Sequence, residues 1–110
     1  MAGKFELYKD KAGEFRFRLK AGNGEVVGTS EGYKAKASAE NGIDSVKTNA
    51  SDDGRYDVFE GKGGKWYFNL KAPNGQVILS SQGYADEGGA KAGTGAVGRA
   101  ADGTSTDDQT

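Results

Sequence analysis

The side chains that could do chemistry in this 110-residue chain are limited by two absences, because the sequence contains no histidine and no cysteine. Thiolate and imidazole metal sites are therefore excluded, and only hard oxygen sites remain. The one acidic cluster is Asp52, Asp53 and Asp57. It has neither the spacing nor the terminal glutamate of a calcium loop. We interpret this cluster as a solvated linker and expect neither a metal nor a cofactor.

Two further patterns could suggest a reaction or a ligand. Ser30 and Ser81 have no histidine to activate them, and a nucleophile needs a base beside it. The segment 61–65, GKGGK, is rich in glycine. A phosphate-binding loop, however, needs a fixed G-x-x-x-x-G-K-[ST] frame that opens a helix, and these glycines join two predicted strands. The sequence thus offers no catalytic residue and predicts that the protein is not an enzyme.

Composition narrows the class of protein further. The chain carries 15 basic and 16 acidic residues, a net charge of −1, whereas DNA-coating proteins are usually strongly basic. No apolar run approaches the roughly 20 residues that span a bilayer, and the first residues do not resemble a signal peptide. We expect a cytoplasmic protein that does not contact a membrane.

The elements that would position any site come from an internal duplication. Shifting the sequence by 51 positions aligns 5–51 with 56–102 without a gap. Identical pairs include Gly13/Gly64, Phe17/Phe68, Leu19/Leu70, Lys20/Lys71, Asn23/Asn74, Gly24/Gly75, Ser30/Ser81, Gly32/Gly83 and Tyr33/Tyr84. We predict a single domain, 1–102, made of repeats 5–51 and 56–102. The polar segment 103–110 is predicted to be a disordered tail.

Each repeat reads as three strands followed by a helix. Segment 14–20 alternates apolar and charged residues, as a half-buried strand does, and Asn23-Gly24 is a strong hairpin signal. Ile43 and Val46 lie on one stripe of the predicted first helix. We expect an α+β fold in which tandem β-β-β-α units form one antiparallel sheet with helices on one face, related by a pseudo-two-fold axis. The predicted core is Phe5, Leu7, Phe15, Phe17, Leu19, Val26, Tyr33, Ile43, Val46, Val58, Trp66, Phe68, Leu70, Val77, Tyr84 and Val97.

The second helix, expected within 86–100, is rich in glycine. Each glycine costs a helix interior up to about 1 kcal/mol against alanine, and the segment contains Gly88, Gly89, Gly93, Gly95 and Gly98. Asp86 is a favourable N-cap for it. We predict that this helix forms but is frayed or weakly held.

The motifs of the first repeat also resemble a known family. FELYKDKAGEFRFRLKA, then NGE, the SEGY turn and a helix ending NGIDSVKTNA are similar to the YegP-like family of small uncharacterised bacterial proteins. The resemblance implies a compact α+β fold built from two β-β-β-α units, and it implies no activity, ligand or site residue. Two features depart from the family pattern: Ala35 replaces a usual helix-capping serine, and the second helix has lost its N-G-I-x-S-V-K core.

One surface carries a functional hypothesis. If the helices cover one face of the sheet, the long strands expose basic and aromatic side chains on the other, with Glu6, Tyr8, Asp57 and Phe59 beside them. Such a face suits a non-catalytic interaction module for a protein or peptide, either on this face or by strand addition at a sheet edge. Alternatives are weak single-stranded nucleic-acid binding and a merely solvated face of cross-strand ion pairs. We also expect a monomer, since the second repeat supplies the partner that a single repeat would need. The candidate binding residues are Arg16, Arg18, Lys20, Tyr67, Asn69 and Lys71.

Overall fold

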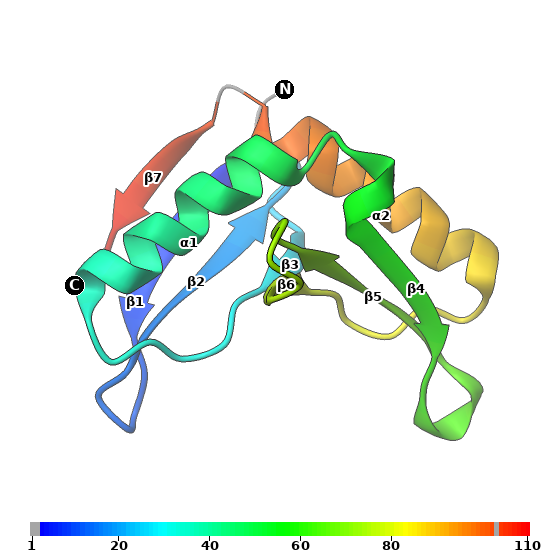
Figure 1. Ribbon diagram of the computed structural model, residues 1–110, viewed down its shortest axis with the longest axis horizontal. Coiled ribbons are helices and arrows are strands. Elements are labelled where there is room, and N and C mark those ends of the chain that lie inside the picture. Colours follow the sequence, from blue (N-terminus) through cyan, green and yellow to red (C-terminus); the bar gives the residue numbers. More distant parts are fainter. Residues whose placement is uncertain (1–2, 103) are drawn as a thin grey trace.

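The computed structural model describes residues 3–102 and 104–110 and shows an α+β fold (Figure 1). Each repeat contributes three strands and one helix in the predicted order. The elements are β1 (Lys4–Lys9), β2 (Phe15–Lys20), β3 (Val26–Thr29), α1 (Lys36–Asn49), β4 (Tyr56–Glu60), β5 (Trp66–Lys71), β6 (Val77–Ser80), α2 (Glu87–Ala101) and β7 (Ser105–Asp108), with short 3-10 turns at Asp53–Arg55 and Lys62–Gly64.

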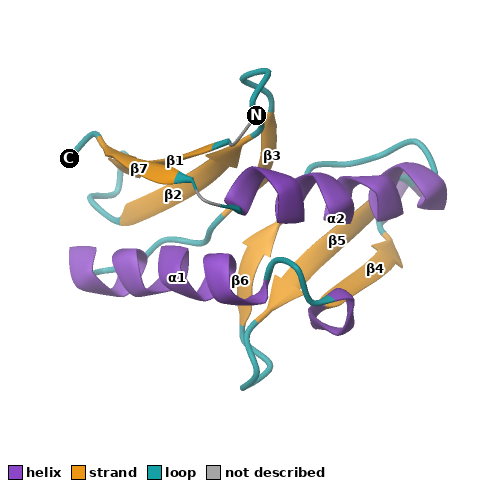
Figure 2. Ribbon diagram, turned by 90° about the horizontal axis from the view of Figure 1, so that it is seen from above, coloured by secondary structure: helices purple, strands orange, loops and turns teal. Residues whose placement is uncertain are grey.

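The strands form one seven-stranded sheet in the order β4-β5-β6-β3-β2-β1-β7. Its two halves meet where β3 and β6 pair, through Thr29 and Ser80. We call β7, β1, β2 and β3 the first leaf, and β6, β5 and β4 the second leaf. Figure 1 shows the leaves diverging from the β3–β6 junction, and Figure 2 shows both helices on one side of the sheet. Each helix contacts strands of both leaves, so the repeats share one core.

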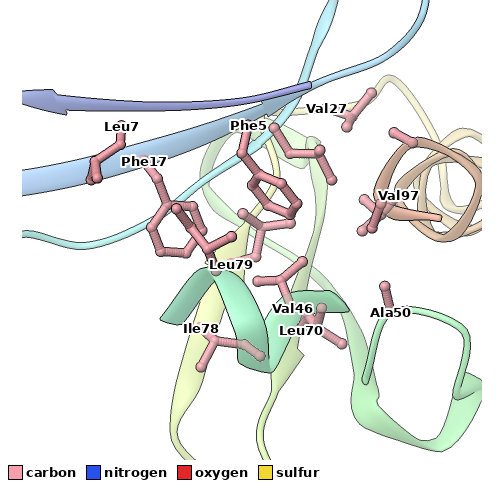
Figure 3. Close-up of a cluster of buried hydrophobic side chains, with 14 of the residues drawn as sticks. Phe5, Leu7, Phe17, Val27, Val46, Ala50, Leu70, Ile78, Leu79 and Val97 are labelled. Atoms are coloured by element: carbon pink, nitrogen blue, oxygen red, sulfur yellow. The ribbon is translucent and has the colours of Figure 1, made fainter. Parts of the chain in front are cut away.

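The core lies between the sheet and the helices. Phe17 and its counterpart Phe68 are fully buried, and each packs against the tyrosine that follows its third strand, Tyr33 or Tyr84. Val46 of α1 and Val97 of α2 close the core on the side opposite the sheet (Figure 3). Phe15, Val58, Tyr33 and Tyr84, which we predicted to be in the core, lie partly buried at its margin.

Two predicted core residues are wrong by one position. Val26 and Val77 are only half-buried, whereas their neighbours Val27 and Ile78 are buried. The cause is a β-bulge in each repeat, where the register shifts between Leu19 and Lys20 and again between Leu70 and Lys71. A bulge sets two residues against one and reverses the inside-outside alternation beyond it. Its appearance in both repeats makes it a feature of the unit.

The prediction of a disordered tail over 103–110 is also wrong for 104–110, while residue 103 lies outside the described residues. Residues Ser105–Asp108 form β7, which pairs in parallel with β1 and makes an otherwise antiparallel sheet mixed. The strand is held at both ends: Thr104 donates a hydrogen bond to the carbonyl oxygen of Gly3, and Asp108 bonds to the Lys36 ammonium 2.5 Å away. The tail is polar, but a strand on an edge needs backbone partners and charge complementarity more than apolar side chains.

The glycine-rich helix α2 runs without a break from Glu87 to Ala101. The Asp86 carboxylate caps it by accepting a hydrogen bond from the Gly89 N–H at 2.7 Å. At the matching position of α1, Ala35 has cap-like extended backbone but provides no side-chain acceptor. The static structure therefore shows the helix that we predicted, and its weak hold remains a prediction.

Candidate functional site

The open face of the sheet, opposite the helices, displays the side chains that alternate with the core. Because Phe17 and Leu19 point inward, their neighbours in β2 point outward, and the same alternation holds in β5. The predicted candidates thus divide into two groups. Strands β6 and β3 separate β2 from β5, so the sheet does not bring the six residues together on one platform. The group in the first leaf is Arg16, Arg18 and Lys20, and the group in the second leaf is Tyr67, Asn69 and Lys71.

In the first leaf the basic side chains surround a carboxylate. The Glu6 side chain is 6% exposed, and its carboxylate lies 2.6 Å from the Arg18 guanidinium and 3.3 Å from the Lys20 ammonium. The hydrogen bond from Arg18 is the main cause that lowers the pKa of Glu6 from its usual range, against the opposing effect of burial. The Arg18 guanidinium also lies over the Tyr8 ring, 4.6 Å from its centroid. Arg18 and Lys20 thus share one carboxylate, so both cations are paired but the group keeps a net positive charge.

The remaining cations of the candidate set have carboxylate partners as well. Arg16 contacts Asp10 at 2.6 Å, and this contact is the main reason that the pKa of Asp10 is lowered. Lys71 lies 3.4 Å from Asp57 across the β4–β5 pair. These contacts match the pattern of cross-strand ion pairs on a solvated sheet.

The second leaf differs because it carries an exposed aromatic pair. Phe59 of β4 and Tyr67 of β5 stack with ring centroids 5.9 Å apart and planes at 22°. Phe59 is 38% exposed, the one exposed large apolar side chain among the residues described. Beside the rings is a shallow depression of about 380 Å³, also bordered by Asn69 and Ser80. Ser80 donates its hydroxyl proton to the Asn69 side-chain oxygen at 2.9 Å, which fixes the amide.

Sequence analysis placed Phe59 beside this face but did not include it among the candidates. The cross-strand register of the second repeat would have identified Phe59. The Asn74-Gly75 hairpin and the alternation of β5 set Tyr67 outward, and antiparallel pairing of the first two strands then sets Phe59 directly opposite.

A groove that sequence analysis missed lies on the other side of the sheet, between α2 and the turn that joins β2 to β3. Its volume is about 710 Å³. It is open because α2 presents Ala92, Ala96 and Ala100 along its wall, where the first repeat carries Asn41, Ser45 and Asn49. Glu25, Arg99 and Asp102 supply its charges, which gives a wall of methyl groups with a mixed polar border.

Within 3–102 and 104–110, no three carboxylates come close enough together to hold a metal ion. None of the helices described there has the length and apolar character needed to cross a bilayer.

The fold and its repeated unit define a class: a tandem β-β-β-α protein with one shared core. The family model described as "Domain of unknown function (DUF1508)" matches the chain twice, at residues 10–57 and 62–108. The chain belongs to this family, and the tandem repeat that we predicted is confirmed. No catalytic family is indicated.

The relatives agree with the resemblance seen in the sequence. The chain is 56% identical to YegP of Escherichia coli K12 over 85 residues, 77% of each protein. It is 52% identical to a UPF0339 protein of Pseudomonas aeruginosa over 100 residues, 91% of each. The solution NMR structure of E. coli YegP, a protein of unknown function, matches with a TM-score of 0.94 and 47% identity, covering 100% of this chain and 95% of that one. A UPF0339 protein of Shewanella oneidensis matches with a TM-score of 0.90 and 44% identity, over 98% of this chain and 92% of that one.

Proposed function

We propose that this protein is a non-catalytic interaction module whose second leaf binds a protein or peptide. The observation that carries the proposal is the stacked pair of Phe59 and Tyr67, which exposes apolar ring surface on a face otherwise occupied mainly by charged and polar side chains. Aromatic side chains supply much of the binding energy in protein interfaces. Asn69 and Lys71 supply polar groups at the border of the aromatic pair.

The second candidate function, single-stranded nucleic-acid binding, has less support. Binding of this kind needs cations that are free to pair with phosphates as well as aromatic rings. Here Arg16, Arg18, Lys20 and Lys71 each have a carboxylate partner, and the net charge is −1. A phosphate would have to displace these carboxylates. The ionic partners therefore favour a polypeptide as the ligand.

A crosslinked pull-down from bacterial lysate tests the proposal with three variants. Phe59→Ser removes the exposed ring, and Glu40→Ser, on the exposed side of α1, is the matched control. Arg16→Glu/Arg18→Glu/Lys71→Glu reverses the basic groups. We expect one protein to be retained by the wild type and by Glu40→Ser, and to be lost with Phe59→Ser.

Two results would overturn the proposal. Equal retention by Phe59→Ser would show that the aromatic pair is not the binding surface. Retained nucleic acid that is lost with the triple variant, and that dissociates steeply as salt rises, would establish the second candidate instead.

We also propose that the protein is a cytoplasmic monomer. The support for a monomer is the shared core, since α1 and α2 each pack on strands of both leaves and so fulfil the role that a second chain would have for a single repeat. Light scattering coupled to size exclusion should give the mass of one 11.5 kDa chain. A mass near twice that value would contradict this expectation.

A further inference from the structure

The two outer edges of the sheet are not equivalent, although the duplication makes their strands equivalent. Strand β1 has β7 on its outer side, whereas β4, its counterpart 51 positions later, ends the sheet. The difference follows from the chain path. After α2 the chain returns as β7 to cover β1, but after α1 it continues into β4 itself. The second repeat therefore lacks the strand that completes the first.

Residues of β4 are more exposed than their counterparts in β1, which β7 covers. Leu7 of β1 is 1% exposed, whereas its counterpart Val58 is only half-buried. The side chain of Glu6 is 6% exposed, and that of its counterpart Asp57 is 58% exposed. Covering β4 in the way that β7 covers β1 would remove this surface from water.

The backbone of β4 is oriented to accept such a strand. The Phe68 N–H donates to the Ser81 hydroxyl, and the Phe68 carbonyl oxygen accepts from the Ser81 N–H, so both groups point to the β6 side of β5. The facing pair of Phe68 and Val58 therefore has no hydrogen bonds between β4 and β5. The N–H and C=O of Val58 thus point to the free edge. In the first repeat the equivalent carbonyl, that of Leu7, accepts a hydrogen bond from the N–H of Gln109 at 2.8 Å.

Charge identifies the kind of strand that fits. Strand β1, KFELYK, carries two lysines and one glutamate, and it binds the acidic strand STDD, with Lys4 3.7 Å from Asp107. Strand β4, YDVFE, carries two carboxylates, and the cation in the place of Lys4, Arg55, lies just before the strand and already contacts Asp52 at 3.5 Å. Lys36 at the start of α1 bonds to Asp108, but the first residue of α2 at the equivalent position is Glu87. The β4 edge has the opposite charge preference.

We propose that the free edge of β4 binds an extended peptide with a basic side chain facing α2, as a parallel strand in the register that β7 takes on β1. A lysine or arginine of that peptide lies where Asp108 lies in the first repeat, and it contacts Glu87 in competition with the exposed pair that Glu87 makes with Lys91 at 3.2 Å. This inference rests on the proposed interaction function and specifies its partner: a basic segment of another protein whose next residues reach the ring of Phe59. The acidic tail of a second copy of this chain does not fit, because it would bring Asp108 against Glu87.

Titration with two synthetic peptides tests the edge. One is the chain's own sequence TSTDDQT from 104–110, and the other is TSTDKQT, with lysine in the place of Asp108. Backbone amide shifts are recorded by NMR on the full-length protein at low salt. We expect TSTDKQT to bind about threefold to tenfold more tightly, since an exposed pair adds modest energy and the swap also removes a repulsion. The largest shifts should fall on Val58 and Glu60, with β7 unchanged.

Two protein variants make the test specific. Glu87→Lys gives the start of α2 the positive charge that Lys36 gives α1. This variant should therefore bind TSTDDQT more tightly than TSTDKQT. Val58→Pro removes the outward N–H while leaving the β4–β5 hydrogen bonds in place, and it should abolish binding of both peptides. If Val58→Pro fails to fold, the charge reversal with Glu87→Lys still decides the question.

The outcomes separate this inference from the proposed function. Binding that is lost with Phe59→Ser but unaffected by Val58→Pro would keep the aromatic face as the binding surface and overturn the edge. Equal affinity for the two peptides, in the wild type and in Glu87→Lys alike, would also overturn the β4 edge as the binding site. So would the absence of any amide shift at millimolar peptide. Tighter binding of TSTDDQT to the wild type would show exchange of tails between copies of this chain and refute the basic partner.

Discussion

Two glycines of α2, two residues apart, should respond to alanine in opposite ways. Gly95 is exposed, and an added Cβ would meet only the end of the Arg99 side chain, at 3.3 Å. Gly93 is buried, and its Cβ would lie 2.4 Å from the Tyr84 hydroxyl oxygen and 2.9 Å from the Phe68 ring. The helix covers these aromatic side chains so closely that it has no room for a methyl group at this point.

The structure gives the size of each effect. Alanine in place of glycine stabilises a helix interior by up to about 1 kcal/mol, and this gain applies to both positions because they belong to one helix. At Gly93 it is opposed by overpacking, which costs about 1 to 3 kcal/mol. The helix contribution cancels in the difference between the two variants. Gly95→Ala should therefore exceed Gly93→Ala in free energy of unfolding by about 1 to 3 kcal/mol, the steric cost alone.

Urea unfolding monitored by tryptophan fluorescence and circular dichroism measures this difference. Relative to the wild type, we expect a higher midpoint for Gly95→Ala and a lower one for Gly93→Ala, with unchanged slopes. Gly42→Ala is the matched control in α1, where the Cβ would lie 2.9 Å from both the Phe17 ring and the Tyr33 hydroxyl, and it should behave like Gly93→Ala. Equal stabilisation by the two α2 variants would refute the close approach and show that helix propensity alone limits α2.

Three further predictions concern the caps and the ion pairs. Ala35→Asp should supply the missing cap of α1 and raise the free energy of unfolding by about 1 kcal/mol, measured by thermal melting with Ala35→Glu as a control for charge without capping. The hydrogen bond from Lys36 is the main cause that lowers the pKa of Asp108 from 3.8 to about 2, so the stabilisation of β7 by this pair is complete above pH 3.8 and should be lost as the pH falls toward 2. Amide shifts of 105–108 between pH 5 and pH 2 would follow this release, and constant shifts would contradict it. Glu6→Gln should weaken the contact with Arg18 and lower the free energy of unfolding by about 1.5 to 3 kcal/mol, as for a hydrogen bond to a charged group. An unchanged urea midpoint would show that solvent already satisfies Arg18.

The repeat, the order of its elements and most of the core were predictable because they depend on local patterns. Phe17, Leu19 and their counterparts Phe68 and Leu70 follow a two-residue period that a half-buried strand requires. The outward-facing candidates followed from the same period, because residues that alternate with Phe17 and Leu19, such as Arg18, must lie on the opposite face.

The errors arose where non-local geometry decides. Val27 replaces Val26 in the core because of a bulge that depends on how β3 pairs with β2, and no residue type in 26–27 announces it. The tail forms β7 because folding brings Lys36 of α1 to the outer edge of β1, where it and Lys4 of β1 contact Asp108 and Asp107. The partners of the candidate cations likewise depended on cross-strand register.

The candidate surface was therefore predictable as a set of residues but not as a site. The period placed Tyr67 and Lys71 outward, yet their separation from Arg18 by two central strands requires the strand order of the whole sheet. The free edge of β4 follows from comparing the repeats after folding, since the sequences of β1 and β4 alone do not show which of them is covered.

The contacts of each helix with both leaves have a consequence for how the chain acquires its structure. Because α1 packs on β5 and β6 as well as on β1 and β2, the first repeat cannot bury its own helix until the second has been made. The repeats must fold in one cooperative transition rather than one after the other during synthesis. A chain cut in the exposed linker near Asp53 should yield two fragments that are unfolded apart and recover the native structure when mixed.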